Sequence, residues 1–135
     1  DGMQGGKQKN EIIKYSKGLI FPVRWHEPFG LALIESLYFG CPVFGTPYGS
    51  LPEIVIPEVG YLTKTASALE LADAIGNVND FSRKKCHEYV MDKFTHIHMM
   101  ASYVRLYEKV LNGEKLNPRA PILQSIQHDK FLPFN

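Results

Sequence analysis

A strand, a helix and a second strand in close succession constrain the fold of this chain more than any other feature. Residues 19–22 read Leu-Ile-Phe-Pro, which is typical of a short buried strand. Residues 31–39 read Leu-Ala-Leu-Ile-Glu-Ser-Leu-Tyr-Phe, which is typical of a helix buried on several sides. We expect this helix to begin at Phe29 and to span about residues 29–39. Gly40 suits the end of that helix, and residues 42–46 follow as a second apolar strand. This pattern predicts a parallel βαβ unit, and therefore an α/β protein.

The rest of the chain predicts mainly helices. We expect helices over residues 8–16, 50–54, 66–77, 81–94 and 95–111, and a short strand at residues 61–62. With only two or three strands, the sheet has an open edge, which favours self-association through strand pairing. We divide the 135 residues into a partial α/β domain, residues 1–112, and an irregular tail with three prolines, residues 113–135.

Two carboxylates flank the start of the apolar helix. Glu27 comes directly before Pro28, whose ring suits the first turn of a helix, and Glu35 is the only charge in the helix itself. An ionised carboxylate in such a helix is costly unless it is paired, hydrogen-bonded or open to a cleft. The two acids therefore predict a ligand site. The alternative is that Glu35 lies on a narrow solvated stripe and that Glu27 only stabilises the helix dipole.

Backbone N–H groups at the helix start suggest what that ligand is. Phe29, Gly30 and Leu31 lie where the first donors of a helix have no partner within the helix. Such a helix start attracts anions, above all phosphate, and a glycine lets the ligand approach the backbone closely. Carboxylates accept hydrogen bonds from hydroxyl groups. Together these features predict a phosphorylated ligand that carries hydroxyls.

The same residues carry a family resemblance. The spacing from Glu27 to Glu35, followed by Gly-Cys-Pro-Val at residues 40–43, resembles the E-x7-E region of retaining GT-B glycosyltransferases of the group 1 (GT4) type. Residues 49–54, Gly-Ser-Leu-Pro-Glu-Ile, are similar to the G-G-x-P-E-I segment of that family, and residues 60–62 to its G-x-L segment. The likeness covers roughly residues 10–112, with a weak match near its end.

The resemblance implies a fold and an activity. The fold is the C-terminal half of a GT-B fold, a Rossmann-like parallel sheet flanked by helices. The activity is transfer of a hexose, with retention, from a nucleoside diphosphate sugar. An acceptor domain then precedes this chain, which alone is expected to be inactive. Two alternatives stay open: another GT-B enzyme, such as a sugar-nucleotide epimerase or a phosphorylase, and a non-catalytic sugar-nucleotide binding module.

The resemblance also assigns roles to the candidate residues. Glu27 is expected to hold hydroxyls of the donor sugar, and Glu35 those of the nucleotide ribose. The amides of residues 29–31 are expected to face the diphosphate or the sugar. Trp25 and His26 either line the donor cleft or pack within the loop.

Ser50 and Glu53 predict a different, structural feature. Their spacing is that of a capping box, in which a serine and a glutamate close the first turn of a short helix. With Gly49, Ser50 also lets the backbone approach a donor sugar or phosphate.

Composition and spacing argue against several other functions. A net charge of +1 with dispersed basic residues argues against a nucleic-acid partner, and no apolar run is long enough to span a membrane. No Asp-x-Asp sequence occurs, and His96 and His98 point apart on the predicted helix, so we expect no metal and no cofactor beside the sugar nucleotide. Cys41 and Cys86 lack metal or redox spacing. We therefore expect reduced thiols and a cytoplasmic protein, or one at the inner face of a membrane.

Overall fold

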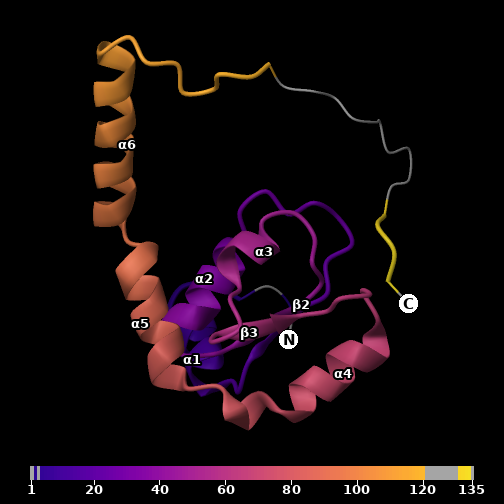
Figure 1. Cartoon of the computed structure of the whole chain (residues 1–135). Coiled ribbons are helices and arrows are strands. Elements are labelled where there is room, and N and C mark those ends of the chain that lie inside the picture. The colour runs from indigo at the N-terminus through magenta and orange to yellow at the C-terminus, as the bar shows by residue number, and fades with distance from the viewer. Residues whose placement is uncertain (1, 3, 121–130, 135) are drawn as a thin grey trace.

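The computed structural model describes residues 2, 4–120 and 131–134 (Figure 1). Its elements are, in chain order, α1 (Gly6–Tyr15), β1 (Leu19–Phe21), α2 (Leu31–Tyr38), β2 (Val43–Gly45), α3 (Leu51–Ile54), β3 (Gly60–Leu62), α4 (Ala68–Gly76), the 3-10 helix η1 (Val78–Asp80), α5 (Arg83–Lys93) and α6 (His96–Leu111). Every helix and strand expected from the sequence is present, with ends that differ by a few residues. The predicted βαβ unit is confirmed as β1–α2–β2.

The sheet is small and entirely parallel. Its order is β1-β2-β3, and Val43 pairs with Leu19 on one side and with Gly60 on the other. The central strand β2 is buried along its whole length, as expected for a parallel strand that is covered on both faces. Within the described residues β1 and β3 are the two edges of the sheet, so the predicted open edge exists there. Whether it pairs with another chain stays a prediction.

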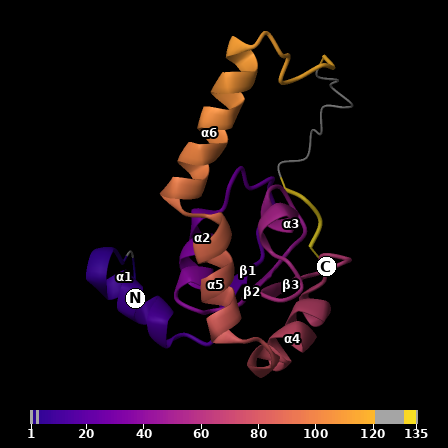
Figure 2. The ribbon, with the colours of Figure 1, turned by 60° about the vertical axis from the view of Figure 1, so that its left-hand side comes forward.

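The apolar helix α2 packs against both β2 and α5 (Figure 2). Leu33 and Leu37 are completely buried, and the buried hydroxyl of Ser36 donates to the carbonyl of Cys41 at 3.1 Å. This packing accounts for Leu33 and Leu37, whereas Leu31 and Tyr38 of the same helix are exposed, so α2 is buried on fewer sides than its sequence predicted. Both cysteines are buried and carry free thiols.

The last helix, α6, extends away from the sheet and has no buried residue (Figure 1). Large apolar side chains are exposed along it, among them Ile97, Met100, Tyr103 and Tyr107. In the part of the chain that the structure describes, no helix is long and apolar enough to cross a membrane.

The motif helix begins later than the sequence predicted. Gly30 is the N-cap of α2 and has a φ of 85°, in the left-handed region that favours glycine. The helix therefore starts at Leu31 and not at Phe29. Because the backbone of Gly30 is left-handed, Phe29 and Gly30 belong to the loop, and the predicted helix start at residue 29 is wrong.

The predicted capping box at Ser50 and Glu53 is also wrong. Ser50 is the N-cap of α3, but its side chain makes no capping hydrogen bond and its backbone is helical, with φ −77° and ψ −10°. An N-cap serine normally has an extended backbone. The N–H of Ser50, which the side chain of Glu53 would have to reach, donates instead to the carbonyl of Glu27 at 2.8 Å. Within the described residues the buried hydroxyl of Ser50 has no partner.

Glu70 on α4 organises the turn that follows β3. Its carboxylate accepts hydrogen bonds from the hydroxyl of Tyr61 at 2.7 Å, from the N–H of Lys64 at 2.8 Å, and from both the N–H and the hydroxyl of Thr65. The bond from the N–H of Lys64 contributes most to lowering the pKa of Glu70 from 4.5 to about 2. The ionised carboxylate is thus the form that the folded turn prefers.

We predict that this turn gives the protein a pH-dependent stability. The folded pKa of Glu70 lies below its unfolded value, so the stabilisation is present above about pH 4.5 and is lost as the pH falls through about 2. Glu70→Gln should therefore lower the melting temperature at pH 7, and the difference from wild type should shrink between those two pH values. Thermal melts at several pH values measure this. A difference that does not change with pH would contradict the prediction.

Residues 131–134 lie against the loops that follow the carboxyl ends of β1 and β2. Leu132 is only 7% exposed, and its N–H donates to the carbonyl of Arg24 at 2.8 Å. Residues 114–120 and 131–134 form no helix or strand. The remainder of the tail predicted for residues 113–135 lies mostly in the range 121–130, outside the described residues.

Candidate functional site

Glu27 closes the loop between β1 and α2. One carboxylate oxygen, Oε1, accepts the N–H of Gly30 at 3.1 Å, and the other, Oε2, accepts the indole N–H of Trp25 at 3.1 Å. The side chain is half-buried, so part of the carboxylate remains open to solvent. Each oxygen has a second lone pair, which leaves Glu27 able to accept further hydrogen bonds from a ligand. The carboxylate therefore has a fixed position at the start of α2.

The three predicted amides differ in availability. The N–H of Gly30 is occupied by Glu27, so this amide does not face solvent as predicted. The amides of Phe29 and Leu31 make no hydrogen bond within the described residues. A helix start carries a partial positive charge, and the carboxylate of Glu27 occupies part of the place where an external anion would lie. Two unused donors remain beside it.

Glu35 is paired with a residue that lies far away in the sequence. Its Oε1 is 2.6 Å from Nζ of Lys9 on α1, and the two side chains are 44% and 36% exposed. The pair explains how a charge is accommodated in an apolar helix, because Glu35 is both neutralised and open to solvent. An ion pair as exposed as this contributes little to stability, about 0–1 kcal/mol. The structure thus leaves Glu35 accessible for a ligand.

His26 belongs to the loop between β1 and α2. Its exposed ring meets that of Tyr48 edge to face, with ring centres 6.4 Å apart. Tyr48 belongs to the loop that connects β2 to α3, so His26 is in contact with that loop. Both interpretations of His26, a cleft residue and a loop-packing residue, remain compatible with this position.

Two neighbouring hollows run along α2. The first, of about 480 Å³, is lined by Phe29 and Leu31 together with Met99 and Tyr103 of α6. The second, of about 560 Å³, is lined by Glu35. Both share Ile34 and the α5–α6 junction at residues 94–96. The structure therefore brings Phe29, Leu31 and Glu35 to one side of α2, whereas neither Glu27 nor His26 lines these hollows.

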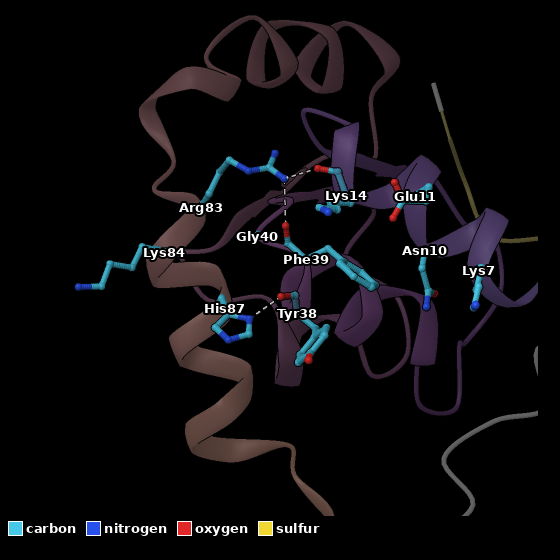
Figure 3. Close-up of a pocket in the computed structure, with 10 residues that line it drawn as sticks. All are labelled: Lys7, Asn10, Glu11, Lys14, Tyr38, Phe39, Gly40, Arg83, Lys84 and His87. Carbon is cyan, nitrogen blue, oxygen red and sulfur yellow. Dashed lines mark hydrogen bonds between the residues drawn. The ribbon is translucent and has the colours of Figure 1, made fainter.

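Another hollow, of about 790 Å³, lies elsewhere and has a structural explanation (Figure 3). Arg83 reaches from α5 and donates to the carbonyls of Lys14 at 2.7 Å, Ser16 at 2.7 Å and Phe39 at 2.9 Å. Beside it, a ring nitrogen of His87 contacts the carbonyl of Tyr38. These carbonyls end α1 and α2, which lead into the amino ends of their strands. The hollow thus lies where β1 and β2 begin, at the opposite end of the strands from Glu27, and Arg83 and His87 contact the ends of the two helices there.

No metal site is evident where the structure describes the chain, since no group of three or more His, Cys, Asp or Glu residues lies close enough to hold an ion. His98 instead contacts the hydroxyl of Thr95 at 2.8 Å, and that hydroxyl caps the start of α6.

Sequence reasoning missed several partners of the site. Lys9 was not connected with Glu35, because the two lie 26 positions apart and α1 carries several other lysines. Trp25 was considered for the cleft, but not as a donor to Glu27. The one available signal was its position two residues before Glu27, which places the indole within reach of the carboxylate.

The fold and the comparisons together assign this chain to a protein family. The family model of "Glycosyl transferases group 1" matches residues 2–93, and the chain belongs to this family. The crystal structure of AviGT4, a glycosyltransferase involved in Avilamycin A biosynthesis, is similar to this structure, with a TM-score of 0.65 and a sequence identity of 21%. The match covers 81% of this chain and 35% of the AviGT4 chain. That likeness confirms the expected fold, a parallel sheet flanked by helices that forms part of a GT-B fold.

Two curated proteins are similar to this chain in sequence. An "Uncharacterized 41.2 kDa protein in cps region" of Klebsiella pneumoniae is 32% identical over 95 residues, which are 67% of this chain and 26% of that protein. N-acetyl-alpha-D-glucosaminyl L-malate synthase of Bacillus anthracis is 30% identical over 119 residues, 82% of this chain and 31% of the synthase. The chain thus spans about a quarter to a third of the length of these relatives.

Proposed function

We propose that this chain is the donor-binding part of an enzyme that transfers a hexose from a nucleoside diphosphate sugar with retention at the anomeric carbon. The observation that carries the proposal is the carboxylate of Glu27, held at the start of α2 beside the unused amides of Phe29 and Leu31. A hydroxyl acceptor next to anion-binding donors suits a ligand that is both a sugar and a diphosphate.

Each residue then has a distinct role. Glu27 accepts hydrogen bonds from hydroxyls of the donor sugar, and Glu35 from those of the nucleotide ribose. The free amides stabilise the negative charge that grows on the departing diphosphate. These groups act by positioning and electrostatics, because the bond-breaking chemistry lies in the sugar nucleotide itself. We propose no metal and no further cofactor.

The whole enzyme requires more than this chain. We propose that an upstream acceptor domain completes the cleft and that these 135 residues alone transfer no sugar. We further propose a cytoplasmic location, or one at the inner face of a membrane. The likeness to N-acetyl-alpha-D-glucosaminyl L-malate synthase is compatible with a sugar donor.

Nucleotide binding tests the role of Glu35. We expect Glu35→Gln in the full-length protein to weaken binding of the preferred nucleoside diphosphate, among UDP, GDP and ADP, by about 1–3 kcal/mol, the scale of a charge-assisted hydrogen bond. This corresponds to about 5- to 150-fold in Kd. Titration calorimetry with each nucleotide measures it.

Two control variants separate ribose binding from the ion pair. Lys9→Gln removes the ion-pair partner of Glu35 and should not weaken nucleotide binding. Glu11→Gln changes the carboxylate of α1, which has no proposed role, and should leave nucleotide binding unchanged. If Glu35→Gln and Lys9→Gln behave alike, Glu35 acts only as an ion-pair partner. Nucleotide-sugar binding without turnover on any acceptor would instead indicate a non-catalytic module.

A further inference from the structure

The end of the described chain contacts both loops that form the proposed donor site. These loops are residues 22–30, between β1 and α2, and residues 46–50, between β2 and α3. Residues 131–134 lie beside these loops, away from α6 (Figures 1 and 2). We call residues 131–134 the strap.

Arg24 attaches the strap to the first loop. Its carbonyl accepts the N–H of Leu132, and its Nε donates to the carbonyl of Leu132, both at 2.8 Å. The guanidinium also lies over the ring of Phe131, with 5.5 Å between the carbon Cζ and the ring centre. A reciprocal pair of hydrogen bonds, together with a buried leucine, fixes the orientation as well as the position of the strap.

Tyr48 attaches the strap to the second loop. Its hydroxyl donates to the carbonyl of Pro133 at 2.7 Å, and the bond joins residues 85 positions apart. The next residue, Gly49, packs directly on the backbone of Glu27. A displacement of Tyr48 therefore reaches Glu27 through one residue.

Both attachment points lie next to residues that set the position of Glu27. Arg24 precedes Trp25, the indole donor to the Glu27 carboxylate, and Tyr48 precedes Gly49 and Ser50, which contact the Glu27 backbone. In the first loop Arg24, Trp25 and His26 are exposed, whereas the buried Val23 and Thr46 anchor the starts of the two loops in the core. Direct bonds already join the two loops, from the hydroxyl of Thr46 to the carbonyl of Val23 and from the N–H of Ser50 to the carbonyl of Glu27. The strap adds a further connection, at the exposed Arg24 and at Tyr48.

We propose that the strap, through Arg24 and Tyr48, holds the two loops in the geometry that presents Glu27 to the donor sugar. Arg24 and Tyr48 are then positioning residues, and the seating of the strap controls the affinity for the sugar nucleotide. The effect on the donor rests on the proposed function, whereas the effect on the loops does not.

The test uses the full-length protein and two variants. Tyr48→Phe removes only the hydroxyl, and replacement of Phe131, Leu132 and Pro133 by glycine unseats the strap. Tyr107→Phe, which removes an exposed hydroxyl on α6, is the matched control. Amide hydrogen exchange of residues 22–30 and 46–50 is measured first, because it needs no ligand. We expect faster exchange in both loops for the two variants and no change for the control.

Binding is measured second, with the nucleoside diphosphate sugar and with the free nucleoside diphosphate. We expect the two variants to weaken binding of the sugar nucleotide by about 3- to 10-fold, the scale of one hydrogen bond, and to change binding of the free diphosphate much less. Unchanged amide exchange in both loops would show that the strap does not hold them in position. If exchange is faster in the variants but the wild-type protein binds no sugar nucleotide, the role of the strap in positioning the loops is supported and the proposed function is wrong.

Discussion

Glu27→Ala in the full-length protein is expected to lower turnover at least about tenfold, because the donor sugar loses the carboxylate that orients it. Binding of the free nucleoside diphosphate should change much less, since Glu27 faces the sugar. The alanine variant also loses the exposed bond from Trp25 and the partly buried bond from Gly30, and we expect this to cost about 1 kcal/mol of stability. Steady-state kinetics and a thermal melt of the same preparation measure both effects.

Glu27→Gln serves as the matched variant for this experiment. Glutamine keeps one oxygen that can accept the N–H of Gly30, but its amino group cannot accept from the indole of Trp25. We expect turnover between those of the wild type and the alanine variant. A clear fall in melting temperature with nearly normal turnover, in either variant, would make Glu27 a structural residue.

Gly49→Ala should be the most damaging substitution outside the carboxylates. Gly49 has a φ of 64°, and an added Cβ would collide with the backbone N and O of Glu27. Relief of the collision must separate the two loops, so we expect turnover to fall by more than about tenfold. The strained backbone should also lower the free energy of unfolding by about 1–3 kcal/mol. Kinetics and denaturant titration measure the two quantities.

Gly113→Ala separates backbone strain from collision. Gly113 has a similar φ of 78°, but nothing lies within 4 Å of the place of its Cβ. This variant should lose some stability from strain and keep normal turnover. Equal losses of turnover in the two variants would show that the contact between Gly49 and Glu27 does not matter for activity.

Patterns that depend on neighbouring residues were sufficient for much of the fold. The apolar runs at residues 19–22 and 42–46 and the apolar helix between them predicted the βαβ unit, because strand and helix periodicities are local properties. The helix start was misplaced by two residues, since the left-handed conformation of Gly30 cannot be distinguished in a sequence from a glycine within the first turn. The capping box failed because Glu27 competes for the N–H of Ser50.

The candidate site could be predicted only in part for the same reason. Glu27, Glu35 and the start of α2 lie within one short stretch, so spacing alone identified them. The ion pair with Lys9 and the contact of Arg24 with Leu132 join residues 26 and 108 positions apart. Such contacts depend on how the helices and the tail pack, which no local pattern records. The ligand roles of Glu27 and Glu35 remain predictions for the experiments above.

The guanidinium of Arg83 has a consequence for how the molecule unfolds. It joins the ends of α1 and α2 to the start of α5, and its three acceptors lose their donor together if α5 detaches. Gly40 adds to this linkage, because its Cα packs against the backbone of Arg83 so closely that a Cβ would lie 2.9 Å from the carbonyl oxygen. The βαβ unit and α5 are therefore one cooperative unit, although more than forty residues of sequence separate α2 from α5.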